Sequence, residues 1–231
     1  MRKTILYILL FFIPVINNAG VDDTKVTTQF NPVPENVRQY TVLHLADFGL
    51  QKEVFDLALK GFKKLDTLGK LQNHDILTIA DYSQSSRQKR LYVIDLKNQK
   101  LLFNTYVAHG RNTGEEYARS FSNAEGSLKS SLGFFVTYQP MIGAETGFAL
   151  TLHGVEKGFN DNAEKRAIIM HAADYATENF IKQHGRLGRS FGCPALPPEM
   201  NKPIIETIKG GSCLFVYNPD KEYLAQSSLL N

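Results

Sequence analysis

The chain has 231 residues, of which 43% are hydrophobic and 21% are charged. This composition is that of a globular protein, and it excludes disorder as the dominant state. The 26 Lys and Arg residues against 23 Asp and Glu residues give a net charge of only +3. Nucleic-acid binding needs a concentrated basic face, so we expect no nucleic-acid partner. Two cysteines also exclude a cysteine-dense secreted scaffold.

The N-terminus has the order of a secretory signal peptide. Met1-Arg2-Lys3 precedes an apolar run from residue 5 to residue 16, and small and polar residues follow up to Gly20. The run is shorter than the roughly 20 residues that a membrane-spanning helix needs, so no stable transmembrane anchor is expected. We predict that residues 1–20 are a signal peptide and that the protein is exported to the periplasm or cell envelope.

The next segments predict a spacer and then a helix. Residues 21–41 are rich in Thr, Asn and Pro and have little apolar periodicity, which indicates a spacer. Between residues 52 and 71, apolar side chains recur at three- and four-residue steps with charged residues between them. This spacing predicts an amphipathic helix.

The rest of the chain predicts a mainly β core. Short runs rich in β-branched and aromatic residues are typical of strands, and they occur at residues 76–82, 90–96, 101–108, 134–138, 148–153, 167–171 and 213–217. A polar segment at 95–99 predicts a hairpin connection, and two late helices are expected near 174–183 and 203–209. We therefore predict one catalytic-sized α+β domain over residues 42–231, with helices packed on a β-sheet or sandwich.

The segment from residue 185 to residue 198 contains three glycines, three prolines and one cysteine, Cys193. Glycines let a substrate approach the backbone closely, and Pro194 fixes the chain just after the cysteine. Arg186 and Arg189 would favour the thiolate form of the cysteine if their side chains reach the sulfur. The backbone N–H groups of Gly192 and Cys193 would suit an oxyanion hole.

A cysteine nucleophile generally needs a histidine within hydrogen-bond reach. Of the six histidines, His171 is the first candidate because it ends an apolar strand, where a rigid scaffold projects a side chain into a cleft. His153 ends another apolar strand and is the second candidate. For either one, the alternative is a solvent-facing or core residue without a catalytic role.

The motif Ser190-Phe191-Gly192-Cys193 resembles the Ser/Thr-His-Gly-Cys signature of the YkuD-type L,D-transpeptidases, and His171 stands at the expected upstream place. More closely, the chain resembles the murein L,D-transpeptidase catalytic-domain branch. That similarity extends from about residue 50 to residue 217 and is carried by these segments: Arg90–Leu96, Val107–Arg111, Phe121–Asn123, Ser130–Gly133, Gly158–Ala163, Ile169–Tyr175 and Gly188–Ala195.

The resemblance implies a mainly β, sandwich-like catalytic domain with flanking helices that acts on peptidoglycan stem peptides. In such an enzyme, Cys193 attacks the carbonyl of the third residue of a tetrapeptide stem and expels the terminal D-alanine, and His171 accepts the thiol proton. An amine acceptor from a second stem gives a 3–3 cross-link, whereas water gives L,D-carboxypeptidase activity. No metal or organic cofactor is implied.

One residue departs from the family signature: Phe191 stands where the larger family has histidine. Either the role of that histidine is dispensable, or His171 carries the base function alone, oriented by a carbonyl such as that of Ala172. Arg189 is expected either to bind a carboxylate of the stem peptide or to pair within the protein. The oxyanion and substrate-binding group of the predicted site consists of Gly192, Ser190 and Arg189.

Four other interpretations remain open. A Cys193–Cys213 disulfide would make the chain an exported binding module, although Cys213 lies in an apolar strand and is expected to be a buried thiol. A zinc hydrolase built on His153, His171 and Cys193 lacks the usual spaced ligand motifs. A cysteine amidase or endopeptidase ordinarily has its cysteine before its histidine, whereas all six histidines here precede Cys193. A retained motif with Phe191 would also fit a binding domain that has lost activity.

Overall fold

A computed structural model of the protein describes residues 34–231. The predicted signal peptide, residues 1–20, and most of the predicted spacer lie outside the described residues. The end of that spacer is not irregular, because helix α1 spans Glu35–Val42. Tertiary contacts stabilise this short helix: the Tyr40 ring lies 5.9 Å from that of Phe55, and its hydroxyl donates to the Leu50 carbonyl at 2.6 Å.

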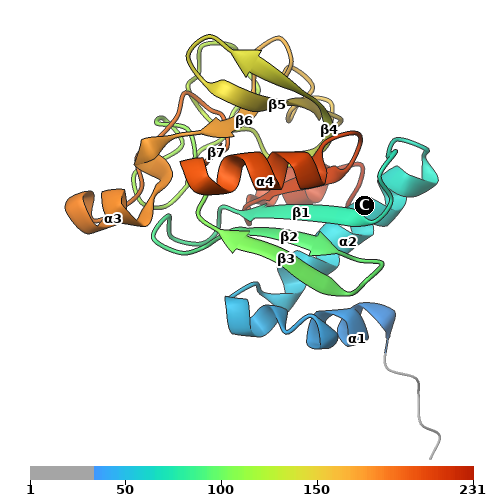
Figure 1. Ribbon diagram of the computed structural model, residues 1–231. Coiled ribbons are helices and arrows are strands. Elements are labelled where there is room, and N and C mark those ends of the chain that lie inside the picture. Colours follow the sequence, from blue (N-terminus) through green and yellow to red (C-terminus); the bar gives the residue numbers. More distant parts are fainter. Residues whose placement is uncertain (1–33) are drawn as a thin grey trace, which may run out of the picture. The chain divides into compact units, whose positions relative to one another are not determined.

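The described residues form one eight-stranded sheet with the order β3-β2-β1-β8-β4-β5-β6-β7, and helices flank it (Figure 1). The predicted α+β class is confirmed. Neighbouring strands are antiparallel except for the parallel pairs β1–β8 and β6–β7. The strands are β1 Ile76–Asp81, β2 Leu91–Asp95, β3 Lys100–Thr105, β4 Gly133–Gly143, β5 Gly147–Gly154, β6 Ile169–Ala172, β7 Ala195–Leu196 and β8 Cys213–Tyr217.

Each predicted strand exists, but some bounds differ. β3 ends at Thr105 instead of residue 108, and β4 continues to Gly143 to form a long hairpin with β5. The predicted β2–β3 connection is confirmed: the Asn98 N–H donates to the Asp95 carboxylate at 2.8 Å, and Gln99 takes a positive φ of 51°. The two-residue strand β7, which follows Cys193, was not predicted.

The longer helices cover the sheet. Helix α2, Lys52–Thr67, packs against β1 and β8, and α4, Pro198–Ile208, packs against β5 and β6 (Figure 1). The prediction placed α4 at 203–209; its earlier start follows from a proline in its first turn, where the missing N–H costs nothing. Two short helices complete the described chain: α3, Glu178–His184, and α5, Lys221–Gln226.

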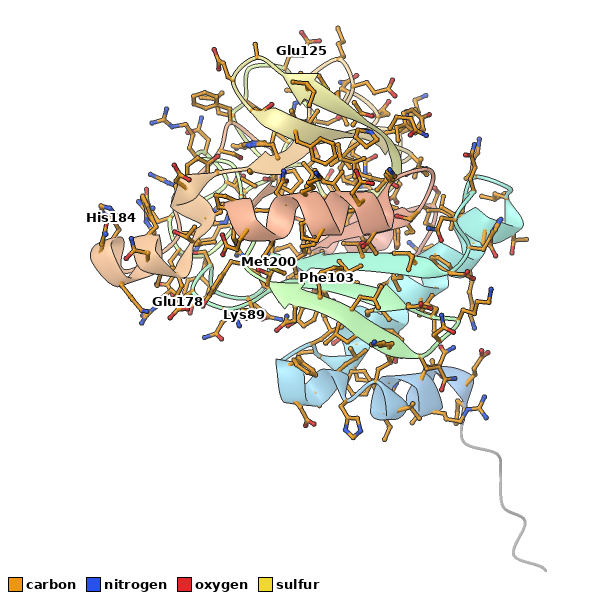
Figure 2. The ribbon with its side chains drawn as sticks, viewed as in Figure 1. Lys89, Phe103, Glu125, Glu178, His184 and Met200 are labelled. Carbon is orange, nitrogen blue, oxygen red and sulfur yellow. The ribbon has the colours of Figure 1, made fainter. Side chains whose placement is uncertain are left out.

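Helix α3 lies at the periphery of the described domain (Figure 1). It follows a 3-10 turn at Asp174–Ala176, and it has no buried side chain. Its residues Glu178 and His184 point away from the sheet (Figure 2). The helix therefore contributes little to the core. Along the chain it connects β6 to the cysteine segment.

A buried polar network connects the sheet to the cysteine segment. Arg90 is fully buried, and its guanidinium donates to the Val107 carbonyl at 3.0 Å and to His109 Nδ1 at 2.7 Å. Because arginine only donates, His109 Nδ1 accepts, and Nε2 carries the proton that bonds the Gly114 carbonyl at 3.2 Å. His109 is thus a neutral structural residue, and its backbone carbonyl accepts the Ser190 N–H at 3.0 Å.

We predict that this network makes folding stability sensitive to acid. Burial and the positive charge of Arg90 lower the pKa of His109 from 6.5 to about 3. Its contribution to stability is therefore complete above about pH 6.5 and is lost as the pH falls towards 3, an effect of at most about 5 kcal/mol. Urea unfolding between pH 7 and pH 4 measures it. His109→Gln, which does not titrate, should show a shallower pH dependence, and equal slopes would contradict the assignment.

Candidate active site

Two of the predicted site residues form the tight turn that presents Cys193. Ser190 Oγ accepts the Gly192 N–H at 3.0 Å and donates to the Cys193 carbonyl at 2.6 Å. Gly192 has a φ of +133°, and a Cβ there would lie 2.8 Å from the Lys129 carbonyl oxygen. Ser190 and Gly192 therefore shape the turn.

This geometry changes the expected oxyanion hole. The Gly192 N–H donates to Ser190 Oγ, so it is not free to bind a substrate oxyanion as predicted. Within residues 34–231, the N–H of Cys193 donates to no backbone carbonyl. Of the two backbone N–H groups that were expected to form an oxyanion hole, the Cys193 N–H is the one that stays a candidate.

The cysteine turn is held from both sides by a neighbouring segment, residues 108–111. The Arg111 N–H donates to the Ser190 carbonyl at 2.8 Å, and Ala108 exchanges two backbone hydrogen bonds with Ala195. Ser130 Oγ adds a bond to the Gly192 carbonyl at 2.9 Å. The backbone on either side of Cys193 is therefore rigidly placed, as a catalytic group requires.

We predict that Gly192→Ala damages this turn. The new methyl would meet the Lys129 carbonyl, and an L-residue is strained at this φ. We expect a loss of roughly 2–3 kcal/mol in unfolding free energy, measured by urea denaturation, together with slower alkylation of Cys193. Gly185→Ala is the matched control, because Gly185 also has a positive φ of 76° but an added Cβ meets nothing within 4 Å. Equal effects of the two substitutions would contradict the close approach.

His171 lies beside the cysteine segment on β6. It is opposite Ala195 in the parallel β6–β7 pair, and its N–H donates to the Pro194 carbonyl at 3.4 Å. His171 Nδ1 lies 2.9 Å from the Ala172 carbonyl, as predicted. A carbonyl only accepts, so Nδ1 carries the proton and Nε2 is left as the basic nitrogen.

His171 and Cys193 both line one cavity of about 850 Å³. Ser190, Phe191 and Arg189 line it as well. A cavity of this size with mixed polar and apolar walls suits a peptide-sized ligand. The structure thus brings the predicted nucleophile, base, serine and arginine together in one place.

Burial raises the pKa of the Cys193 thiol, and three groups oppose this effect. They are the backbone N–H of Ile169, the guanidinium of Arg166 and the backbone N–H of Cys193 itself. Arg186 and Arg189 were expected to favour the thiolate if their side chains reached the sulfur, and this condition is not met. Both guanidinium groups bind Glu115, at 2.7 Å and 2.6 Å respectively.

Arg189 makes the internal pair that was one of its two expected roles. Its Nη1 also donates to the carbonyls of Arg111 at 3.1 Å and Gly114 at 3.3 Å. These bonds tie the loop at 111–115 to the cysteine segment. Binding of a substrate carboxylate by Arg189 stays a prediction.

Arg166 is a residue of the cavity wall that was not predicted from the sequence. It lies just before β6, lines the cavity, and binds the loop at 122–131 through four hydrogen bonds. No recognised motif includes it. The only sequence signal was indirect, because Phe121–Asn123 and Ser130–Gly133, two segments of the family resemblance, include its partners Ser122 and Ser131.

The other candidate residues lie elsewhere or have other contacts. His153 is paired with Glu164 at 2.9 Å and stacks on Tyr138, and it is not among the residues that line the cavity. Phe191 is 68% exposed, with the Arg111 guanidinium 5.8 Å from its ring. It therefore stands at the rim of the cavity.

Both cysteines are free thiols, and Cys213 is fully buried as predicted. Burial raises the pKa of the Cys213 thiol, so this group stays neutral. Across residues 34–231, no group of three or more His, Cys, Asp or Glu side chains is arranged to hold a metal ion. No helix in the described part of the chain is long and apolar enough to cross a membrane.

The chain is similar to several solved structures, including L,D-transpeptidases and a cell shape determining protein. An L,D-transpeptidase from Mycobacterium smegmatis is 12% identical, with a TM-score of 0.40, and the match covers 62% of this chain and 59% of that one. A mutant of the Enterococcus faecium L,D-transpeptidase is 13% identical, with a TM-score of 0.38 and coverage of 62% and 50%. The helical cell shape determining protein Pgp2 from Campylobacter jejuni is 16% identical, with a TM-score of 0.42 and coverage of 82% and 58%.

This chain thus matches between half and three fifths of the length of these three solved proteins. No curated protein matches it. The sequence pattern of the L,D-transpeptidase catalytic domain, in contrast, matches residues 46–217, which include the cysteine turn, β6 and the whole cavity lining. The chain therefore belongs to the L,D-transpeptidase catalytic-domain family.

Proposed function

We propose that the protein is an exported peptidoglycan L,D-transpeptidase that forms 3–3 cross-links in the cell envelope, with Cys193 as nucleophile and His171 as base. One observation carries this proposal. The hydrogen bond from His171 Nδ1 to the Ala172 carbonyl makes Nε2 the nitrogen that can accept a proton, on a side chain that shares a cavity with the Cys193 thiol. The exported location rests on the signal-like residues 1–20.

In the first step, His171 Nε2 accepts the thiol proton and the Cys193 sulfur attacks the carbonyl carbon of the third stem residue. The negative charge that develops on the carbonyl oxygen is stabilised by the Cys193 N–H. Collapse of this intermediate breaks the peptide bond to the terminal D-alanine. The leaving amine takes the proton from His171, and a thioester remains on Cys193.

In the second step, the side-chain amine of another stem peptide attacks the thioester carbonyl. His171 accepts a proton from the attacking nitrogen and returns one to the departing sulfur. The product is an amide between two third residues, and the free thiol is regenerated. Water in place of the amine gives a tripeptide and makes the enzyme an L,D-carboxypeptidase.

Arg189 is proposed to bind a carboxylate of the stem peptide. It lines the cavity, and its partner Glu115 is 69% exposed at the side chain, so a substrate carboxylate competes with Glu115 for the same guanidinium. Exchange of one carboxylate for another keeps the arginine paired. Ser190 supports this arrangement by closing the turn between Arg189 and Cys193.

Incubation of the full chain with tetrapeptide muropeptides tests the proposal. We expect release of one D-alanine for each acyl transfer, and cross-linked dimers in the products separated by liquid chromatography and mass spectrometry. Tripeptide without dimer would assign carboxypeptidase activity instead. No D-alanine from stems with different diamino acids at the third position would contradict both activities and favour a binding domain.

A further inference from the structure

Arg166 is a half-buried cation without a carboxylate partner among the described residues. Its Nη1 donates to the Ser122 carbonyl at 2.7 Å and to Ser131 Oγ at 2.5 Å, and its Nη2 donates to Ser127 Oγ at 3.1 Å and to the Lys129 carbonyl at 2.6 Å. All four acceptors are neutral oxygens. This differs from Arg186 and Arg189, whose charges are both compensated by Glu115.

The guanidinium of Arg166 lies against the cysteine turn. Its Nη2 is 3.4 Å from the position that a Cβ on Gly192 would take, and the residue lines the same cavity as Cys193. The Cys193 thiol donates to the carbonyl of Ala167, the residue next to Arg166, at 3.7 Å. The positive charge therefore lies against the cysteine turn, close enough to the thiol to lower its pKa.

None of the other charged or titratable groups that line the cavity compensates the charge of Arg166. Glu145, at the β4–β5 turn, and Asp174, after β6, are exposed. Tyr175 has its pKa raised to about 12 by burial, so it is neutral at pH 7. Arg189 is paired with Glu115. Among the described residues that line this cavity, Arg166 is thus the one arginine or lysine that no carboxylate compensates.

A partly buried charge is costly unless an anion or a dense set of hydrogen bonds compensates it. We propose that Arg166 is the counter-ion of the Cys193 thiolate and acts as a positioning residue that stabilises the anion formed when the thiol gives its proton to His171. The inference rests on the role of Cys193 proposed above. The four bonds to the loop at 122–131 fix the guanidinium so that its charge stays next to the sulfur during both steps.

The pH dependence of Cys193 alkylation by iodoacetamide tests this role without any stem peptide. Peptide mass spectrometry separates modification of Cys193 from that of the buried Cys213. We expect Arg166→Gln to slow alkylation at pH 7 about tenfold and to move the midpoint of the pH profile upwards, because an opposite charge beside a thiol favours its ionised form. Arg166→Lys retains the charge and should keep most of the wild-type profile.

Several variants separate charge from structure. Ser131→Ala removes one hydrogen-bond acceptor of Arg166 but no charge, and Arg186→Gln removes a cation that Glu115 already compensates, so neither should move the midpoint. Arg166→Met is a second neutral variant that fills the same space, and circular dichroism checks that each protein folds. An unchanged midpoint in the neutral variants would overturn the proposal. Equal shifts in the Lys and Gln variants would assign Arg166 a purely structural role and overturn it too.

Turnover of muropeptides, measured on the same variants, keeps the two proposals distinct. A higher KM with an unchanged alkylation profile would mean that Arg166 binds the substrate carboxylate, which contradicts its role as counter-ion. If turnover depends on Cys193 but the midpoint of the alkylation profile is the same in the Arg166 variants, only the present inference is rejected. An Arg166-dependent midpoint without any turnover supports the present inference and rejects only the proposed function.

Discussion

Cys193→Ala is expected to reduce the release of D-alanine from tetrapeptide stems by at least about a thousandfold, because no other side chain in the cavity replaces a thiolate nucleophile. The fold should persist, because the hydrogen bond that the Cys193 thiol donates to the Ala167 carbonyl is long, at 3.7 Å. Initial rates of D-alanine release and thermal unfolding of the same samples measure the two effects.

Cys213→Ala is the matched control for this substitution. Cys213 is fully buried in β8, where removal of the sulfur leaves a small cavity and costs roughly 1 kcal/mol of stability. It should leave the rate of D-alanine release nearly unchanged. Turnover that survives in Cys193→Ala, or that disappears equally in Cys213→Ala, would contradict the assignment of the nucleophile.

The second large effect is expected from His171→Gln. Glutamine retains a donor for the Ala172 carbonyl but has no basic nitrogen for the thiol proton, so kcat should fall by about 10²–10⁴. The residual rate should rise steadily with pH, because alkali ionises the thiol without help from a base. A pH series of single-turnover acylation rates from pH 5 to pH 10 measures both features.

His153→Gln is the corresponding control, since His153 also ends an apolar strand segment but pairs with Glu164 and does not line the cavity. We expect its acylation rate to stay within about twofold of wild type. A similar loss in both histidine variants, or wild-type rates in His171→Gln, would remove His171 from its proposed role as base.

The strands and the main helix were predictable because their residues repeat with the period of the structure they form. The apolar face of α2 and the β-branched runs of β1, β2 and β8 are buried as expected. Elements stabilised by tertiary contacts were not predictable. Helix α1 depends on packing against α2, and β7 is only two residues long, so its identity as a strand comes from its partner β6.

The candidate site likewise has a part that was predictable from the sequence and a part that was not. His171 and Cys193 were selected because one ends a strand and the other lies in an unusual Gly- and Pro-rich segment, and both line one cavity; their catalytic roles stay a prediction. The charges around the sulfur were not predictable from neighbours in sequence. Arg186 and Arg189 are close to Cys193 along the chain but pair with Glu115, whereas Arg166 is distant along the chain and adjacent in space. Bonds from Arg166 to the backbone carbonyls of Ser122 and Lys129 hold its charge at the cysteine turn. Bonds to backbone carbonyls do not depend on the identity of the accepting residue, so they leave no pattern in the sequence.

The central claim is that Cys193 carries the acyl group of the third stem residue, and trapping that intermediate tests it most directly. The full chain is mixed with tetrapeptide stems, quenched in acid within one turnover, and mapped by mass spectrometry. We predict a thioester adduct, with the mass of the stem lacking its terminal D-alanine, on the peptide that contains Cys193, and no adduct on Cys193→Ala. Release of D-alanine with the acyl group on another residue, or with unmodified Cys193 throughout the reaction, would contradict the account.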